Sequence, residues 1–147
     1  MRERRCRQAV NPISTTVVRV LAYQGPYAAT KGGLNALSQS LRAEYIEAPV
    51  GFSVVAPGSV AGRGMFARGQ AEGIRMPRAL RLTTPEAVAR AVVRAIEADV
   101  PQVLVYPSPI RPILALGLVA PRLAERANEQ LGLGRLFRPA AQARERA

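Results

Sequence analysis

The chain has 147 residues, a formal net charge of +11, one cysteine and no histidine. Its length is that of about one average domain. One cysteine excludes an internal disulfide, and the lack of histidine excludes a histidine-based zinc site or catalytic triad, so no metal site is expected. A thiol without a partner is typical of a reducing, cytoplasmic setting.

The basic residues are almost all of one kind, because all but one of the 21 are arginines. They either neutralise nucleic-acid phosphates or are simply the surface cation that this chain prefers. The second interpretation is favoured, because the arginines are scattered and no aromatic residues alternate with them. We therefore expect no nucleic-acid partner. We expect no membrane span either, since the longest apolar run, Ile113 to Ala120, is shorter than the roughly 18 residues that a span needs.

The first elements along the chain are a strand and a long helix. Residues 1–10 form a basic segment that we expect to be poorly ordered. The β-branched residues of Val10–Val20 predict a buried strand followed by a loop. Pro26 suits the first turn of a helix, and leucines recur at helical spacing within residues 26–47. The Gly32–Gly33 pair weakens this helix, which suggests that another backbone or a ligand approaches it closely.

The remaining elements alternate between strands and helices. They are a buried strand over Phe52–Ala56, a loop over residues 59–82 that is long enough to be functional or mobile, a helix capped by Thr84, a strand over Gln102–Tyr106, and an apolar helical tail over residues 110–131 that Pro121 interrupts.

This alternation predicts an α/β fold in which helices join parallel strands. Ligands of such sheets bind at the carboxyl ends of the strands, so the loop over residues 59–82 is a candidate ligand loop. Residues 109–147 are expected to be an apolar helical tail with a disordered basic end.

The only lysine, Lys31, follows Tyr27 by four residues, so the two side chains share one face of the predicted helix. A free tyrosine has a pKa near 10, too high for a base at neutral pH. A neighbouring ammonium stabilises the phenolate and lowers that pKa, which would suit Tyr27 for proton transfer. The alternative is a pair on the helix surface without any function.

The segment NPISTTVVRVLAYQGPYAATKGG, residues 11–33, resembles the active-site segment of the short-chain dehydrogenase/reductase family. That family has a serine near a strand end, a tyrosine thirteen residues later and a lysine four residues beyond. Here they are Ser14, Tyr27 and Lys31. The resemblance implies that Ser14 polarises a substrate carbonyl and that Tyr27 exchanges the proton. Lys31 would lower the pKa of Tyr27 and bind the nicotinamide ribose.

The resemblance continues downstream. The segment FSVVAPGSV is similar to the family's next strand and its Pro-Gly loop, which implies that Pro57, Gly58 and Val60 contact the cofactor. Gly62 stands where the family often has a threonine. Residues 84–107 and 114–137 are similar to the family's penultimate helix with its last core strand, and to the apolar tail of members that act on hydrophobic alcohols and ketones.

The similarity covers residues 11–138, and it implies that residues 11–108 are the catalytic, carboxyl-terminal half of such a domain. One part of the family pattern is missing. No G-x-G-x-x-G turn, which cradles the dinucleotide pyrophosphate at a helix N-terminus, follows a strand in this chain. We therefore expect a partial Rossmann-like fold, a doubly wound parallel sheet lacking the N-terminal dinucleotide-binding half. The implied cofactor is NAD or NADP.

Three hypotheses about function follow. The first is an NAD(P)-dependent oxidoreductase that interconverts carbonyl and alcohol groups of a small, hydrophobic substrate, truncated and weakly active or inactive alone. The second is a non-catalytic remnant that acts through protein–protein association. The helix over residues 26–47 is the expected contact, and it also predicts a homo-oligomer. The third and least favoured is a basic nucleic-acid-binding module.

Overall fold

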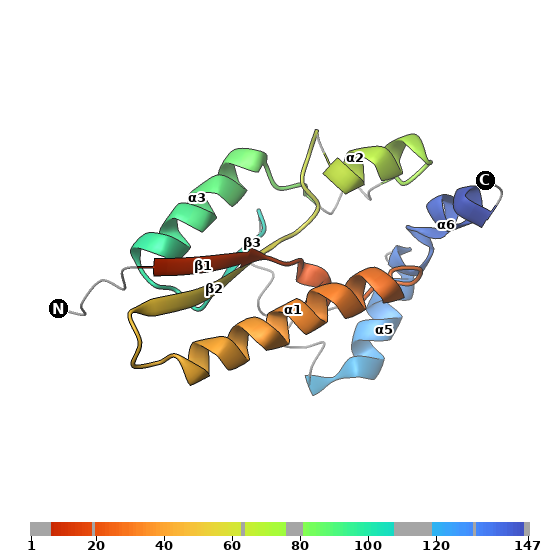
Figure 1. Cartoon of the computed structure of the whole chain (residues 1–147). Helices are drawn as coiled ribbons and strands as arrows, with labels where there is room; N and C mark the ends of the chain where they lie inside the picture. The colour runs from red at the N-terminus through yellow and green to blue at the C-terminus, as the bar shows by residue number, and fades with distance from the viewer. Residues whose placement is uncertain are drawn as a thin grey trace.

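The computed structural model describes residues 7–18, 20–62, 64–75, 81–107, 119–130 and 132–145. In these ranges three parallel strands form a sheet in the order β1–β2–β3 (Figure 1). They are β1 (Arg7–Pro12), β2 (Val50–Pro57) and β3 (Gln102–Val105). The parallel pairing confirms the predicted α/β class.

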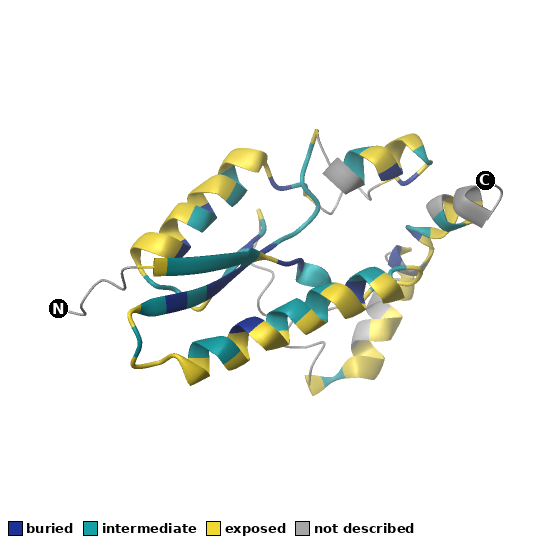
Figure 2. Cartoon of the chain, in the orientation of Figure 1, coloured by how far each residue is buried: buried dark blue, intermediate teal, exposed yellow. Residues whose placement is uncertain are grey.

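Two long helices cover opposite faces of the sheet. Helix α1 (Gly25–Glu44) lies on one face and α3 (Pro85–Glu97) on the other (Figure 1). Successive residues of a strand point to opposite faces. Accordingly Val54 belongs to the core beneath α1, while Val55 belongs to the core beneath α3. Figure 2 shows the buried stretch along β2, the central strand. The sheet is thus doubly wound.

Helix α3 begins where the sequence predicts. The Thr84 side chain accepts a hydrogen bond of 3.2 Å from the Ala87 amide, and Pro85 occupies the first turn, where its missing N–H is no loss. A backbone hydrogen bond and the Thr84 hydroxyl hold the pKa of Glu86 below its ordinary value. A polar cap and an acidic first turn therefore define this end.

Strand β1 differs from its prediction. It begins at Arg7 and ends at Pro12, so residues 7–10, expected to be poorly ordered, form most of the strand; residues 1–6 lie outside the described ranges. The Gln8 side chain donates hydrogen bonds to Ser53 Oγ (3.2 Å) and to Asp99 Oδ1 (3.0 Å). These partners are 45 and 91 residues away, so the local sequence does not reveal them.

Three segments also differ from the sequence-based expectation. The predicted loop over residues 59–82 contains a short helix, α2 (Gly64–Ala71). Pro121 begins helix α5 (Pro121–Gln130) instead of interrupting a longer one, and residues 109–118 of the predicted tail lie outside the described ranges. The basic end, expected to be disordered, forms helix α6 (Arg138–Glu145) after a single 3-10 turn, η2 (Leu133–Arg135).

A polar cluster closes the end of the sheet where β2 begins. Arg42 of α1 donates to the Phe52 carbonyl (2.7 Å) and to Asp99 Oδ1 (2.9 Å), and its second terminal nitrogen donates to the Asp99 carbonyl (2.9 Å). Gly51 lies against the side chains of Gln8 and Asp99, where an added Cβ would overlap both. The cluster therefore joins α1, β1, β2 and the turn before β3.

Candidate functional site

The Lys31 side chain joins helix α1 to the end of strand β1. Its ammonium donates a hydrogen bond of 3.0 Å to the Pro12 carbonyl and lies 6.0 Å from the centroid of the Tyr27 ring. That distance is at the outer limit for an interaction between a cation and a ring. An ammonium has three donors, so two remain for other groups after the Pro12 bond. The structure thus brings Lys31 to both Tyr27 and the strand that leads into Ser14.

Ser14 lies two residues beyond β1, where it caps a 3-10 turn, η1 (Thr15–Val17). Its backbone is extended, and its Oγ accepts a hydrogen bond of 3.3 Å from the Thr16 amide. Only 9% of the residue is exposed. A hydroxyl that accepts one hydrogen bond still has its own proton to donate. Ser14 is therefore held in place by its acceptor side and is able to donate to a carbonyl oxygen.

Tyr27 occupies the first turn of α1 and is half-buried. Its hydroxyl has no hydrogen-bond partner among the described residues. Helix α1 packs against η1, the turn that Ser14 caps. The candidate catalytic residues Ser14, Tyr27 and Lys31 thus come from the end of β1 and from the adjoining start of α1.

Gly58 has a structural reason to be glycine. An added Cβ would meet ring atoms of Tyr106 at 2.5 and 2.6 Å, and the Gly58 amide bonds to the Val105 carbonyl at 3.0 Å. Burial raises the pKa of Tyr106 above its ordinary value. Gly58 therefore extends the ladder between Pro57 at the end of β2 and β3, and the ring of Tyr106 accounts for its missing side chain.

Val60 directs its backbone polar groups away from Thr83. It forms an isolated parallel bridge with Thr83, in which the Ser59 carbonyl and the Ala61 amide make the two hydrogen bonds, each of 2.9 Å. In a parallel bridge of this kind the middle residue directs its own N–H and C=O to the opposite side. No described residue bonds to those two groups. A ligand with both a donor and an acceptor, such as a carboxamide, fits them.

The groups of NAD or NADP can be compared with the residues that this chain offers. The Val60 backbone suits a carboxamide, and the free donors of Lys31 suit ribose hydroxyls. Gly62, with φ of 80°, has no side chain to offer in place of the threonine that is common in the family. The sequence contains no glycine-rich turn for the pyrophosphate. The residues present therefore fit the nicotinamide end of the cofactor.

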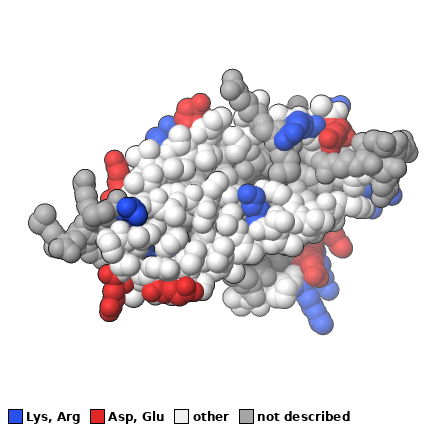
Figure 3. Space-filling view, in the orientation of Figure 1, with Lys and Arg blue, Asp and Glu red and all other residues white. Residues whose placement is uncertain are grey.

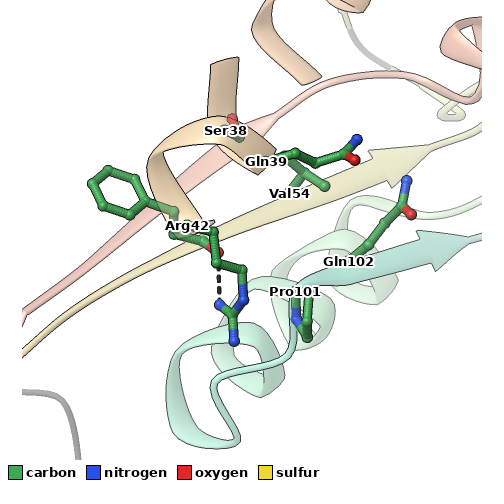
Figure 4. Close-up of a pocket in the computed structure, with 7 residues that line it drawn as sticks. Ser38, Gln39, Arg42, Val54, Pro101 and Gln102 are labelled. Carbon is green, nitrogen blue, oxygen red and sulfur yellow. Dashed lines mark hydrogen bonds between the residues drawn. The ribbon is translucent and has the colours of Figure 1, made fainter. Parts of the chain in front are cut away.

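A shallow pocket of about 120 Å³ lies elsewhere, between the second half of α1 and the start of β3 (Figure 4). Ser38, Arg42 and Pro101 are among the residues that line it. Eleven residues of helix separate Tyr27 from Ser38, a rise of about 16 Å at 1.5 Å per residue. The pocket is therefore distinct from the site at Tyr27.

Sequence reasoning missed two features around the site. The Pro12 carbonyl, which binds Lys31, is a backbone group that no motif marks. The buried leucines of the tail, Leu133 and Leu136, pack with Ile74 beyond α2. Their spacing of three residues is a weak helical signal, and it does not predict the partner segment.

Three further observations concern metal ions, membranes and surface charge. The described residues contain no group of three or more His, Cys, Asp or Glu side chains that could hold a metal ion. None of the described helices is long and apolar enough to cross a bilayer. On the face shown in Figure 3, the described basic side chains are scattered and do not form one patch.

Comparison with known proteins gives relatives that are about twice as long. No protein-family model matches the chain. The ketoacyl reductase HetN of a Nostoc species is 31% identical over 138 residues, which are 90% of this chain and 47% of that protein. The chain thus spans about half the length of the curated relative that it matches.

Solved structures share the fold over a similar part of their length. A short-chain dehydrogenase from Burkholderia cenocepacia in complex with NADP has a TM-score of 0.57 and 19% identity, over 84% of this chain and 48% of that one. An oxidoreductase of the same family from Burkholderia thailandensis has a TM-score of 0.59 and 23% identity, over 76% and 49%. A third dehydrogenase, from Novosphingobium aromaticivorans, has a TM-score of 0.57 and 20% identity, over 95% and 47%.

Proposed function

We propose that this chain, a member of the short-chain dehydrogenase/reductase family that spans about half the length of the relatives it matches, carries the proton-transfer site of an NAD(P)-dependent carbonyl reductase. The reaction converts a ketone, reduced NAD(P) and one proton into an alcohol and oxidised NAD(P). When bound, the cofactor supplies the hydride. Every other role in the proposal falls to residues of this chain.

Ser14 holds the substrate oxygen in this proposal. Its Oγ already accepts the Thr16 amide, so its O–H proton is the part that remains to bind the carbonyl. A donor fixed in place before the reaction stabilises the negative charge that develops on that oxygen. Tyr27 then gives its hydroxyl proton to the oxygen as the alcohol forms.

The position of Lys31 carries the proposal, because its ammonium is bonded to the strand end before Ser14 and lies near the Tyr27 ring. It bonds to the Pro12 carbonyl at 3.0 Å and lies 6.0 Å from the Tyr27 ring centroid. In the proposal its two remaining donors bind the nicotinamide ribose, and Val60, just beyond Pro57 and Gly58, binds the carboxamide through its backbone. The substrate is an alcohol or ketone of low polarity, a choice that the name of the ketoacyl reductase relative supports.

The experiment is a spectrophotometric assay of the purified 147-residue chain with NADPH or NADH and a ketone, beside a cofactor titration by nicotinamide fluorescence. Turnover is expected to be weak, because the sequence has no glycine-rich phosphate turn. Tyr27→Phe should lower it by about 10²-fold or more, the usual contribution of a general acid. Tyr23→Phe is the matched control, since Tyr23 is 57% exposed and lies four residues earlier.

Turnover that survives Tyr27→Phe, or turnover lost equally in Tyr23→Phe, would contradict the proposal. A chain without any turnover would instead favour the second candidate, a non-catalytic member that acts by association. The outer face of α1 supports that candidate: Leu37 is 53% exposed, and no atom lies within 4 Å of a Cβ added at Gly32 or Gly33. The close approach expected at these glycines is thus absent among the described residues.

The same open face of α1 underlies the proposed homo-oligomer. Helices approach closely where small residues leave room for a facing backbone. Analytical ultracentrifugation of the wild-type chain and of Leu37→Asp tests this contact. The wild type should sediment as a dimer or larger species, and the substitution should shift it to the monomer. A wild-type chain that stays monomeric at high concentration would contradict the proposed homo-oligomer.

A further inference from the structure

A third apolar cluster lies outside the sheet. Its buried members are Ile74, Leu133 and Leu136, and partly buried Leu21, Phe66 and Phe137 pack against them. The two clusters beneath α1 and α3 share no residue with it. We call Leu133, Leu136 and Phe137 the tail strap, because they follow α5 and pack against two other segments, one at Leu21 and one at Phe66 and Ile74.

The tail strap lies beyond the carboxyl ends of the strands. Figure 1 shows α2, α6 and the start of α1 on that side of the sheet. A Cβ added at Gly73 would touch the Pro139 side chain at 3.4 Å. The chain after the strap therefore also runs close to the end of residues 64–75, which we call the α2 segment. Because the proposed reaction site is at the same ends of the strands, the strap is well placed to act on it.

One contact of the strap reaches the connection between two proposed catalytic residues. Leu21 lies in the segment that runs from the Ser14 turn to the helix of Tyr27. The Gln24 amide bonds to the Leu21 carbonyl at 3.3 Å, and the Ala28 amide bonds to the Gln24 carbonyl at 2.8 Å to begin α1. The turn that starts the Tyr27 helix is therefore anchored in the same cluster as the tail.

The α2 segment has few other means of support. Helix α2 has eight residues and contains Gly64 and Gly69, and helices of that length are unstable alone. The Val60–Thr83 bridge fixes the base of the segment and not its far end. No other core cluster of the described residues includes a residue of the α2 segment. Packing of Phe66 and Ile74 on the strap thus supplies its remaining attachment.

We propose that the tail strap is a positioning element that holds the α2 segment over the substrate side of the Ser14–Tyr27 site. The proposal rests on the reductase function proposed above. The catalytic side chains are fastened separately, Lys31 to Pro12 and Ser14 to Thr16, by bonds that involve no strap residue. Loosening the strap should therefore weaken substrate binding and leave the chemical step nearly intact.

The test compares Leu136→Ala with Leu123→Ala in the full chain. Leu136 is 7% exposed, whereas Leu123 on α5 is 56% exposed and outside the cluster, so it is the matched control. Hydrogen exchange by mass spectrometry should show the amides of residues 64–75 exchanging about tenfold faster in Leu136→Ala, with β2 unchanged. Leu136→Met, of similar volume, should restore the wild-type rates.

Kinetics supply the second readout. Leu136→Ala should raise KM for an apolar ketone about tenfold and change kcat by less than about twofold, as expected for lost substrate binding. Faster exchange spread equally over β2 and residues 64–75 would overturn the proposal, because Leu136 would then serve only general stability. Unchanged exchange at 64–75 would overturn it as well. If the wild type has no turnover, the reductase function fails, while the exchange data still decide whether the strap holds α2.

Discussion

The ammonium of Lys31 donates a hydrogen bond of 3.0 Å to the carbonyl oxygen of Pro12, so the only lysine of the chain fastens α1 to the end of β1. We expect Lys31→Met to lower the free energy of unfolding by about 1 kcal/mol, since it leaves that carbonyl without its donor. Lys31→Arg should recover part of the loss, because it keeps a charged donor. Urea denaturation measures both; an unchanged midpoint in Lys31→Met would show that the bond contributes nothing.

Gly51 and Gly33 should respond in opposite ways to a methyl group. Gly51→Ala places a Cβ against the side chains of Gln8 and Asp99, and overpacking of this kind costs about 1–3 kcal/mol. Gly33→Ala adds a methyl group to open space on α1 and should stabilise the helix by about 0.5–1 kcal/mol. Thermal unfolding of the two variants gives the comparison. Equal shifts in one direction would contradict the packing described at Gly51.

Arg42 and Asp99 should behave as one unit. Their side chains are 19% and 22% exposed, and Arg42 donates to both the carboxylate and the main-chain carbonyl of Asp99. We expect Arg42→Ala to cost about 2 kcal/mol, in the range of hydrogen bonds to charged groups. Arg126→Ala, at an exposed position on α5, is the control and should cost less than about 0.5 kcal/mol. A double-mutant cycle with Asp99→Asn should be non-additive; strict additivity would mean that the pair is not coupled.

Tyr106 should make the chain less stable in base. Burial raises the pKa of its hydroxyl above the ordinary value of 10.0, so the folded state disfavours the phenolate. The unfolded chain ionises first, and stability that is intact below pH 10 falls as the pH rises towards the raised value. Tyr106→Phe removes this dependence. Unfolding free energies measured from pH 9 to 11 should decline more steeply in the wild type, and parallel curves would refute the burial effect.

Local signals explain which elements the sequence predicted well. Thr84 and Pro85 mark the start of α3 with a cap and a first-turn proline, and both act within a few residues. The four-residue spacing of Tyr27 and Lys31 likewise predicts their common helix face, and the structure confirms that proximity. The roles of Ser14, Tyr27 and Lys31 stay predictions, as do the cofactor contacts of Pro57, Gly58 and Val60.

Distant contacts explain what the sequence did not predict. The start of β1 was missed because Gln8 gains its partners from Ser53 and Asp99, far along the chain. The glycines of α2 lower its helix propensity and so predict a loop, while the leucines that pack against the α2 segment follow about sixty residues later. In each case tertiary packing outweighs the local preference of the segment.

The bridge between Val60 and Thr83 has a consequence for variation in this chain. The chain between Val60 and Thr83 forms a long loop with a short helix, and the bridge holds the two ends of that loop together. Closing a longer loop costs only slightly more entropy. A graft of foreign sequence between Gly62 and Arg81 should therefore leave the three strands and α3 in register, so this stretch is expected to tolerate exchange.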